Sequence, residues 1–380
     1  MPLGNRKDKI MSPTQCIFPN EELDFDDVMI RPKESNINSR FDVKIVKPYH
    51  FKWSDKVIEG NPAIAANMAT TGTFEIAKVM QKHRMFTALH KHYTAEQLIA
   101  FLKENAASFG NNDYIFIGTG LRSDDFEKLN QVMRTGLCHN ICLDAPNGYI
   151  QAFKAHLNKL RHYFPKAVIM AGNIVTGEKA KDIIMNGADV VKVGIGSSAV
   201  CRTRRQTGVG RPQFSAIQEC IQSVKSEEGM VCSDGGVTCA GDYVKAIGAG
   251  CDFVMMGGYL AGCDESAGQL ITKFFRTNEV NSDGTEKIEE KKYKLFYGMS
   301  SKFAQEKHYD GMPSYRASEG TVMEIPYKGP IENTLQELEG GLRSACTYTN
   351  TSELSQFHKN VQFYRVRKQL NRCFGYNEKE

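Results

Sequence analysis

The sequence lacks long apolar runs, an excess of charge of one sign and closely paired cysteines. Its longest apolar stretches, such as residues 62–69, are far too short to span a bilayer, and residues 1–15 contain no secretory signal. The 48 basic and 44 acidic residues are well mixed and give a net charge of +4, so nothing indicates a nucleic acid or a membrane as partner. The eleven cysteines include no CxxC pair. That pattern is typical of reduced thiols, so we expect a cytoplasmic protein.

A repeated unit is present instead, in which a short apolar run ends in a polar residue or glycine and a helical stretch follows. Eight such runs occur, at 62–68, 85–90, 114–120, 140–145, 167–173, 190–196, 230–236 and 252–258. Near-continuous apolar strands that alternate with helices indicate a parallel sheet. Eight units predict a closed (β/α)₈ TIM barrel of the α/β class. An open doubly wound sheet is the alternative, and the even spacing of the units disfavours it.

The segments between the runs show helical spacing of apolar residues at 72–83, 95–106, 123–133 and 148–164. Thr94 and Gln97 fit a capping box at the start of the second of these helices. We expect a loosely held tail at 1–21 and one barrel domain at 22–380, with no second domain inserted. Three stretches interrupt the rhythm: a Gly/Ser/Arg loop at 194–213, a charged hairpin or loop at 262–294, and a loop at 300–320 that is a candidate mobile lid.

Chemically versatile residues stand at the ends of the predicted strands, which form the active face of a TIM barrel. They are Asn67, His90, Lys91, His92, Thr119, Asp144, Asn173, Cys201, Asp234, Gly235, Gly236, Gly257 and Gly258. The glycine pairs after the seventh and eighth strands predict a phosphate site, because glycine lets backbone N–H groups approach an anion. Tight turns are the alternative for either pair alone. His90 and His92 lie on one side and could bind a metal, but no third ligand is nearby, so we favour a role in lining the site.

Cys201 is the candidate nucleophile. It lies on a glycine-rich loop beside Arg202, Arg204 and Arg205, which favours a usable thiolate. A buried structural thiol is the alternative for this residue, as for the other cysteines.

Several motifs together resemble one enzyme family. They include LDFDDVMIRPK at 23–33, TALHKHY at 87–93, AGNIVTGE at 171–178, the Cys201 loop, SDGG at 233–236 and GGLRSACTY at 340–348. The chain is similar to the IMP dehydrogenase/GMP reductase family from residue 23 onward. YGMSS at 297–301 and YRASEG at 315–320 resemble the reductase branch, and the CBS insertion common in the dehydrogenases is absent.

The resemblance implies NADPH-dependent reductive deamination of GMP to IMP and ammonia, a step of purine salvage. It implies that Cys201 adds to C2 of the purine and forms a covalent thioimidate, while Thr203 and Glu319 handle the proton for ammonia. Lys91 is implied as a further catalytic group. The implied nucleotide contacts are Asp234, Gly235, Gly236, Gly257, Gly258, Tyr297, Gly298, Met299, Arg316, Ala317, Ser318 and Gly320.

The same resemblance implies an NADPH site at Ser39, Arg40, Lys91, Thr119, Asp144 and Ala145. A segment made of Ser344, Ala345, Cys346 and Thr347 matches one that reaches the cofactor of a neighbouring subunit, which implies a homotetramer. The carbonyl groups of Gly196 and Ser198 lie where the family binds a monovalent cation such as potassium.

The chain departs from the family pattern near the predicted site. Ala69 replaces an aspartate, Ser198 a glycine, Ala199 a serine, Arg202 a threonine and Pro146 a small residue. Two alternatives to GMP reduction therefore stay open: a related oxidoreductase such as an IMP dehydrogenase, and a catalytically weak nucleotide-binding regulator. The YRASEG segment argues against the first, and the retained Cys201, Thr203 and Glu319 argue against the second.

Overall fold

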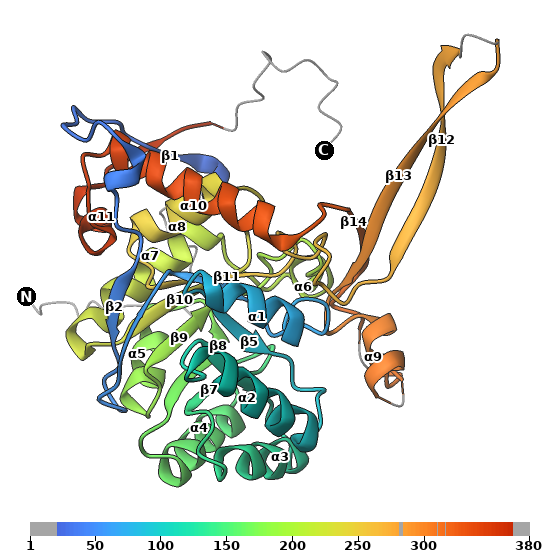
Figure 1. Ribbon diagram of the computed structural model, residues 1–380. Coiled ribbons are helices and arrows are strands. Elements are labelled where there is room, and N and C mark those ends of the chain that lie inside the picture. The colour runs from blue at the N-terminus through green and yellow to red at the C-terminus, as the bar shows by residue number, and fades with distance from the viewer. Residues whose placement is uncertain (1–20, 281–283, 310, 316, 368–380) are drawn as a thin grey trace, which may run out of the picture.

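Eight parallel strands close into a barrel in the order in which they occur along the chain (Figure 1). The computed structural model describes residues 21–280, 284–309, 311–315 and 317–367. The barrel strands are β4 (Ala63–Ala65), β5 (Phe86–Leu89), β6 (Ile115–Thr119), β7 (Asn140–Asp144), β8 (Val168–Ile174), β9 (Val190–Val193), β10 (Met230–Asp234) and β11 (Phe253–Met256). β11 pairs with β4 and completes the ring. The predicted TIM barrel and all eight predicted strands are confirmed.

A layer of helices surrounds the barrel. Its members are α1 (Phe74–Lys82), α2 (Ala95–Phe109), α3 (Ser123–Met133), α4 (Gln151–Tyr163), α5 (Gly177–Met185), α7 (Gln213–Val224), α8 (Ala240–Ala249) and α10 (Ile331–Tyr348). The predicted capping box of α2 is confirmed: Thr94 Oγ1 accepts from the N–H of Gln97 at 3.2 Å, and Gln97 Oε1 accepts from the N–H of Thr94 at 2.9 Å. These two bonds satisfy N–H groups that have no partner within the helix.

The period of two along each strand separates an inner from an outer core. On β7, Ile141 and Leu143 pack with the helix layer, whereas Cys142 lies in the cluster inside the barrel. The amino-terminal end of the barrel is filled by the hairpin of β2 (Lys47–His50) and β3 (Val57–Gly60), whose Tyr49 stacks on Phe253 with centroids 4.5 Å apart. This packing leaves the carboxyl ends of the strands as the open face.

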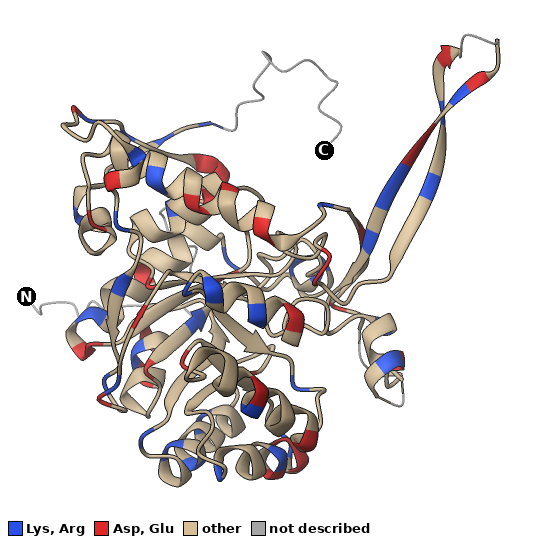
Figure 2. Ribbon diagram, in the orientation of Figure 1, with Lys and Arg blue, Asp and Glu red and all other residues tan. Residues whose placement is uncertain are grey.

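A long hairpin of β12 (Leu270–Val280) and β13 (Glu286–Tyr297) projects from that face, and β14 (Val322–Pro326) pairs with its base (Figure 1). The sequence predicts either a charged hairpin or a charged loop at 262–294, and the structure shows the hairpin. It carries both acidic and basic side chains, as do the outer helices (Figure 2). β1 (Val28–Ile30) pairs with β15 (Phe363–Arg365) on the outside of the barrel, beyond the short helix α11 (Phe357–Asn360).

Two segments predicted as loops each contain a short helix. Within 194–213 lies α6 (Thr203–Thr207), and within 300–320 lies α9 (Lys302–His308). Ser301 caps α9 through a bond from the N–H of Ala304 to its Oγ at 3.1 Å, and the Ala304 side chain is buried. Each helix is too short to show periodicity in the sequence. Across the described residues, every helix falls short of the length or apolar character that a membrane crossing requires.

Candidate active site

A cavity of about 200 Å³ opens at the carboxyl ends of the barrel strands. Residues predicted for the nucleophile, the proton relay, the nucleotide, the reductant and the cation all contribute to its wall. They are Asp144, Ala145, Gly196, Ser198, Cys201, Thr203, Asp234, Gly235, Gly257, Gly298, Met299, Glu319 and Gly320. Asn67 and Asn173, which the sequence also places at strand ends, line it as well. The fold thus gathers one site from segments spread over most of the chain.

Cys201 is held in this wall by pairing between two distant loops. Cys201 forms an isolated antiparallel bridge with Gly320, and the N–H of Arg202 donates to the carbonyl of Glu319 at 2.7 Å. The strand-like contact continues with a bond from the N–H of Thr321 to the carbonyl of Val200 at 3.0 Å. Gly298 lies against this pair, where a Cβ atom would stand 2.9 Å from the Val200 carbonyl. The absence of a side chain there lets three segments meet beside the thiol.

A chain of hydrogen bonds runs from the thiol to a carboxylate. Cys201 Sγ donates to Thr203 Oγ1 at 3.2 Å, and Thr203 Oγ1 donates to Glu319 Oε2 at 2.8 Å. Because each bond points toward the carboxylate, the chain offers a path by which the thiol proton can leave. The same path in reverse can deliver a proton to a group bound beside the sulfur.

The flanking arginines contribute less to this site than the sequence suggests. The side chains of Arg202, Arg204 and Arg205 are exposed. Arg204 pairs with Asp24 at 3.7 Å and donates to the carbonyl of Arg211. The relay through Thr203 is therefore the feature that distinguishes Cys201 from the other described cysteines, of which seven are buried and one, Cys239, is exposed.

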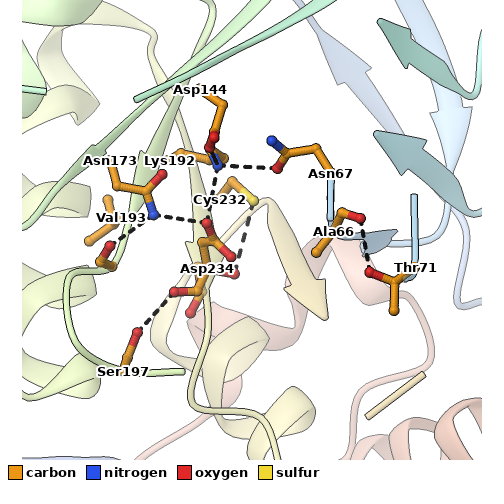
Figure 3. Close-up of polar contacts among 12 residues, drawn as sticks. Ala66, Asn67, Thr71, Asp144, Asn173, Lys192, Val193, Ser197, Cys232 and Asp234 are labelled. Carbon is orange, nitrogen blue, oxygen red and sulfur yellow. Dashed lines mark hydrogen bonds and ion pairs between the residues drawn. The ribbon is translucent and has the colours of Figure 1, made fainter. Parts of the chain in front are cut away.

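A buried lysine that the sequence analysis did not single out lies at the floor of the cavity. Lys192 Nζ forms ion pairs with Asp144 Oδ1 and, at 3.2 Å, with Asp234 Oδ2 (Figure 3). It also donates to Asn67 Oδ1 at 3.4 Å. Burial alone would raise the pKa of Asp144, but the charge and hydrogen bond of Lys192, together with the charge of Lys91 and a hydrogen bond from Asn67, outweigh burial and the pKa of Asp144 is lowered. Conversely, the two carboxylates raise the pKa of Lys192 despite its burial, so the ammonium stays charged.

The sequence did contain a signal for Lys192. On each of three strands, a charged residue stands two positions after a residue of the inner core. The pairs are Cys142 and Asp144, Val190 and Lys192, and Cys232 and Asp234. Because strand side chains alternate, these three charges share the next inward layer.

Asn173 supplies a further polar group to this layer. Its Nδ2 donates to Asp234 Oδ2 and to the Gly194 carbonyl, both at 2.8 Å, which fixes the orientation of the amide. Its buried Oδ1 has no hydrogen-bond partner in the part of the chain that the structure describes. Since an unpartnered buried oxygen is costly, this atom is suited to accept a bond from a ligand.

A second cavity of about 270 Å³ adjoins the first and shares Ser197, Ser198, Gly235 and Gly257 with it. Gly236 and Gly258, for which the sequence predicts phosphate binding, also line it. Gly235 has φ of +96°, and a Cβ atom there would lie 2.5 Å from Ser197 Oγ, so only glycine suits this turn.

Three carboxylates also line the second cavity, those of Asp24, Asp26 and Asp242. Asp24 Oδ1 accepts from the N–H of Gln213 at 3.2 Å, and Asp242 Oδ2 accepts from the N–H and hydroxyl of Thr238. These bonds offset part of the negative charge of Asp24 and Asp242 at this end.

Several predicted nucleotide contacts lie next to the first cavity and not in its wall. Tyr297 is buried, and its hydroxyl lies 3.4 Å from His308 Nε2. Ala317 is exposed, and Ser318 Oγ accepts from the N–H of Lys302 at 3.2 Å. Arg316 lies outside the described residues.

The predicted reductant contacts on the barrel strands differ in the direction of their side chains. Asp144 and Ala145 line the cavity, whereas Thr119 is fully buried between β6 and α3 and its Oγ1 donates to the Asp125 carbonyl at 3.4 Å. Thr119 is on the outward side of its strand, so its side chain does not face the barrel interior. Lys91 is half-buried. Its Nζ lies close to Gly120, which directly follows Thr119, because a Cβ atom on Gly120 would be 3.2 Å from it.

The remaining predicted contacts form a separate group around the end of α10. Ser39 caps the short 3₁₀ helix Arg40–Asp42, which contacts α10. Ser344, Ala345 and Thr347 are half-buried on α10, and the Cys346 thiol is in the outer core. Neither the 39–40 nor the 344–347 segment lines the two cavities.

The predicted cation ligands occupy the loop that leads to Cys201. Gly196 has φ of +81°, and the Ser198 carbonyl accepts from the N–H of Cys201 at 2.9 Å. Ser198 is not among the residues with positive φ, so its side chain fits the backbone without strain. Carbonyl oxygens suit a potassium ion, and the second lone pair of the Ser198 carbonyl is compatible with that role.

His90 and His92 belong to a stacked aromatic group that joins the barrel to α9. His90 stacks on Tyr93 with centroids 3.9 Å apart, and His92 stacks on His308 with centroids 4.1 Å apart. Within the described residues, no group of three or more His, Cys, Asp or Glu side chains could hold a metal ion. The geometry is that of packed rings.

Comparison with known proteins agrees with this arrangement. The sequence model of the IMP dehydrogenase / GMP reductase domain matches residues 22–371. The chain belongs to the IMP dehydrogenase / GMP reductase family. It is 45% identical over 355 residues to "GMP reductase 2" of Homo sapiens, which covers 93% of this chain and 97% of the relative. It is 46% identical to the "GMP reductase" of Onchocerca volvulus over 93% of both chains, and 45% identical to that of Salmonella paratyphi C (strain RKS4594) over 93% and 97%.

One departure from the family pattern has a simple structural setting. Ala69 is buried against Tyr297 and Ala304, beneath α9. A methyl group fits this apolar contact, whereas a carboxylate would be desolvated there.

Proposed function

We propose that this protein catalyses the NADPH-dependent reductive deamination of GMP to IMP and ammonia. The observation that carries the proposal is the hydrogen-bonded chain from Cys201 through Thr203 to Glu319 in the cavity wall. Membership of the family and about 45% identity to proteins named GMP reductase support the same reaction.

In the first step, the Cys201 thiol loses its proton through Thr203 to Glu319, and sulfur attacks C2 of the purine. A C–S bond forms, the ring C2–N3 π electrons move to N3, and C2 becomes tetrahedral. Glu319 then returns a proton through Thr203 to the exocyclic amino group, so that ammonia departs and a thioimidate remains. Covalent catalysis divides one difficult displacement into two easier steps, and ammonia leaves only when it is protonated.

In the second step, the C–S bond would break and Cys201 would be regenerated as IMP is released, once a bound NADPH had supplied a hydride to C2. The structure offers groups that fit such a reductant. The Asp144 carboxylate and the unpartnered Asn173 Oδ1 can accept hydrogen bonds from ribose or carboxamide groups. Lys91 lies close enough to act on Asp144, whose pKa its charge helps to lower.

The nucleotide would extend from Cys201 into the second cavity. Asp234 would accept from the ribose hydroxyls, and the N–H groups around Gly236, Gly257 and Gly258 would bind the phosphate. Gly298, Met299 and Gly320 would surround the base.

We further propose that the active form is a cytoplasmic homotetramer that responds to potassium. The 39–40 segment and the 344–347 segment of α10 lie away from both cavities, which suits contact with a reductant bound to a neighbouring subunit. The carbonyls of Gly196 and Ser198 would bind the cation.

Segment 300–320, including α9, would act as the lid.

The decisive assay compares two reactions of the purified protein. GMP with NADPH should cause a loss of absorbance from NADPH and release of ammonia. IMP with NAD⁺ should give no sustained formation of NADH. The reverse result would assign the chain to the dehydrogenase branch, and nucleotide binding without either reaction would identify a binding protein.

A further inference from the structure

We propose that Lys192 is a positioning residue that holds the carboxylates of Asp144 and Asp234 aligned, and so joins the reductant end of the cavity to the nucleotide end. The roles of the two carboxylates rest on the proposed function. The position and charge of Lys192 do not depend on it.

The geometry places the ammonium group between the two ends. Lys192 is 1% exposed, on β9, while Asp144 is on β7 and Asp234 is on β10 (Figure 3). Both carboxylates line the cavity. A single cation thus fixes side chains from β10, which is paired with β9, and from β7, which lies beyond β8 on the other side.

The barrel provides space for this side chain. Gly172 on β8 is paired in register with Lys192, and a Cβ atom at residue 172 would lie 2.4 Å from Lys192 Cβ. On the other side Lys192 is paired with Cys232, whose side chain belongs to the apolar layer below. The ammonium is therefore directed toward the polar layer above the apolar core.

Removal of this charge would leave two half-buried carboxylates close together. Like charges and burial both favour protonation of a carboxylate. The other groups that act on Asp144 are the charge of Lys91 and a hydrogen bond from Asn67, and Cys142 lies below it. Asn173 continues to donate to Asp234. Lys91 would compensate in part, so we expect one carboxylate to titrate about one to two pH units higher without Lys192.

The test compares Lys192→Met with Lys192→Arg. Infrared titration of ligand-free protein should detect a protonated half-buried carboxyl group at about pH 5 in the methionine variant and not in the wild type. The acid limb of kcat/KM for GMP reduction should move upward by about one to two pH units in the same variant. The arginine variant retains the charge and should restore both readouts toward the wild type.

Lys294→Met is the matched control. Lys294 is also buried, but its Nζ donates to three backbone carbonyls, of Cys263, Asp264 and Ser266. Its loss should lower stability without changing either pH readout. An unchanged infrared titration in a folded Lys192→Met protein, or an equal change in Lys294→Met, would overturn the inference. If the infrared result holds and the wild type does not reduce GMP, the proposed function fails and the assignment of Lys192 stands.

Discussion

Thr203 donates its hydroxyl hydrogen to Glu319 at 2.8 Å although 116 residues separate the two in sequence. The bond commits the threonine hydroxyl to one direction, so its oxygen accepts from Cys201. Glu319 is thereby linked to the sulfur without touching it, which is the arrangement that the proposed proton transfer requires.

Glu319→Gln should separate the two chemical steps. The amide nearly preserves shape but cannot supply the proton that ammonia needs, so steady-state GMP reduction should fall by about 100-fold or more. Formation of NADPH from IMP and NADP⁺, measured by stopped flow over one turnover, needs no ammonia step. It loses only the acceptor of the thiol proton, which solvent can replace, so it should survive better. Glu324→Gln is the control, because Glu324 is on β14 and pairs with Lys273 away from the site. Equal losses in both reactions would mean that Glu319 acts only in the deprotonation of Cys201 and does not supply the proton for ammonia.

Cys201→Ala should abolish turnover and leave nucleotide binding largely intact. The sulfur forms the covalent bond, whereas the glycine turns and Asp234 belong to other segments of the wall. Mass spectrometry of the wild type with IMP and NADP⁺ should show a nucleotide adduct on the peptide that contains Cys201. The exposed Cys239 is the control, and its alanine variant should retain the adduct and activity. Substantial GMP reduction by Cys201→Ala would exclude the covalent mechanism.

Ser198→Gly should decrease activation by potassium. Ser198 adopts its backbone conformation without strain, so glycine relieves nothing there and adds conformational freedom, which corresponds to about 0.5–1 kcal/mol, or about two- to fivefold weaker cation affinity. The measurement is the steady-state rate in potassium chloride against choline chloride at constant ionic strength. Ala199→Gly introduces the same freedom one residue later and should have a smaller effect. A strong potassium response in the wild type that Ser198→Gly leaves unchanged would contradict this expectation.

The stacked histidines should make the protein less stable in mild acid. Burial and the charge of His308 lower the pKa of His92 to about 3, and the same causes lower the pKa of His90 to about 4. In the unfolded chain both would titrate near about 6.5. The unfolded state therefore binds more protons as the pH falls below about 6.5, and the free energy of unfolding decreases toward about pH 4.

The measurement for this prediction is the urea midpoint at several pH values between 7 and 5. His92→Phe keeps a ring against His308 and removes a titrating group whose buried Nε2 has no partner within the described residues. Its midpoint should fall less steeply than that of the wild type. His162→Phe alters an exposed histidine and serves as control. Parallel curves for all three proteins would show that other groups dominate acid unfolding.

Local patterns in the sequence were enough to predict the barrel. The runs around β4 to β11 were recognisable because parallel strands buried on both sides are almost continuously apolar, and Thr94 with Gln97 marked the start of α2. Cys201 and the glycine turns followed from their positions after strands. Those features depend on residues that are close in sequence, so a local sequence pattern is enough to predict them.

Features that depend on side-chain direction or on distant contacts were harder to predict. Lys192 appears in the middle of an apolar run, and its importance emerges only when the parity of three strands is compared. Thr119 stands at a strand end like Asp144 but lies on the opposite side of its strand, toward α3. The helix α9 was predicted as loop because its seven residues give too few turns to reveal a pattern.

The pairing of Cys201 with Gly320 also bears on the order in which the protein matures during synthesis. The ribosome produces the thiol long before residues 319 and 320, with the projecting hairpin in between. A nascent or prematurely terminated chain therefore carries the cysteine without the carboxylate that completes its relay. The reactive centre is assembled only after most of the polypeptide has been made, so partial translation products lack the means to act on nucleotides.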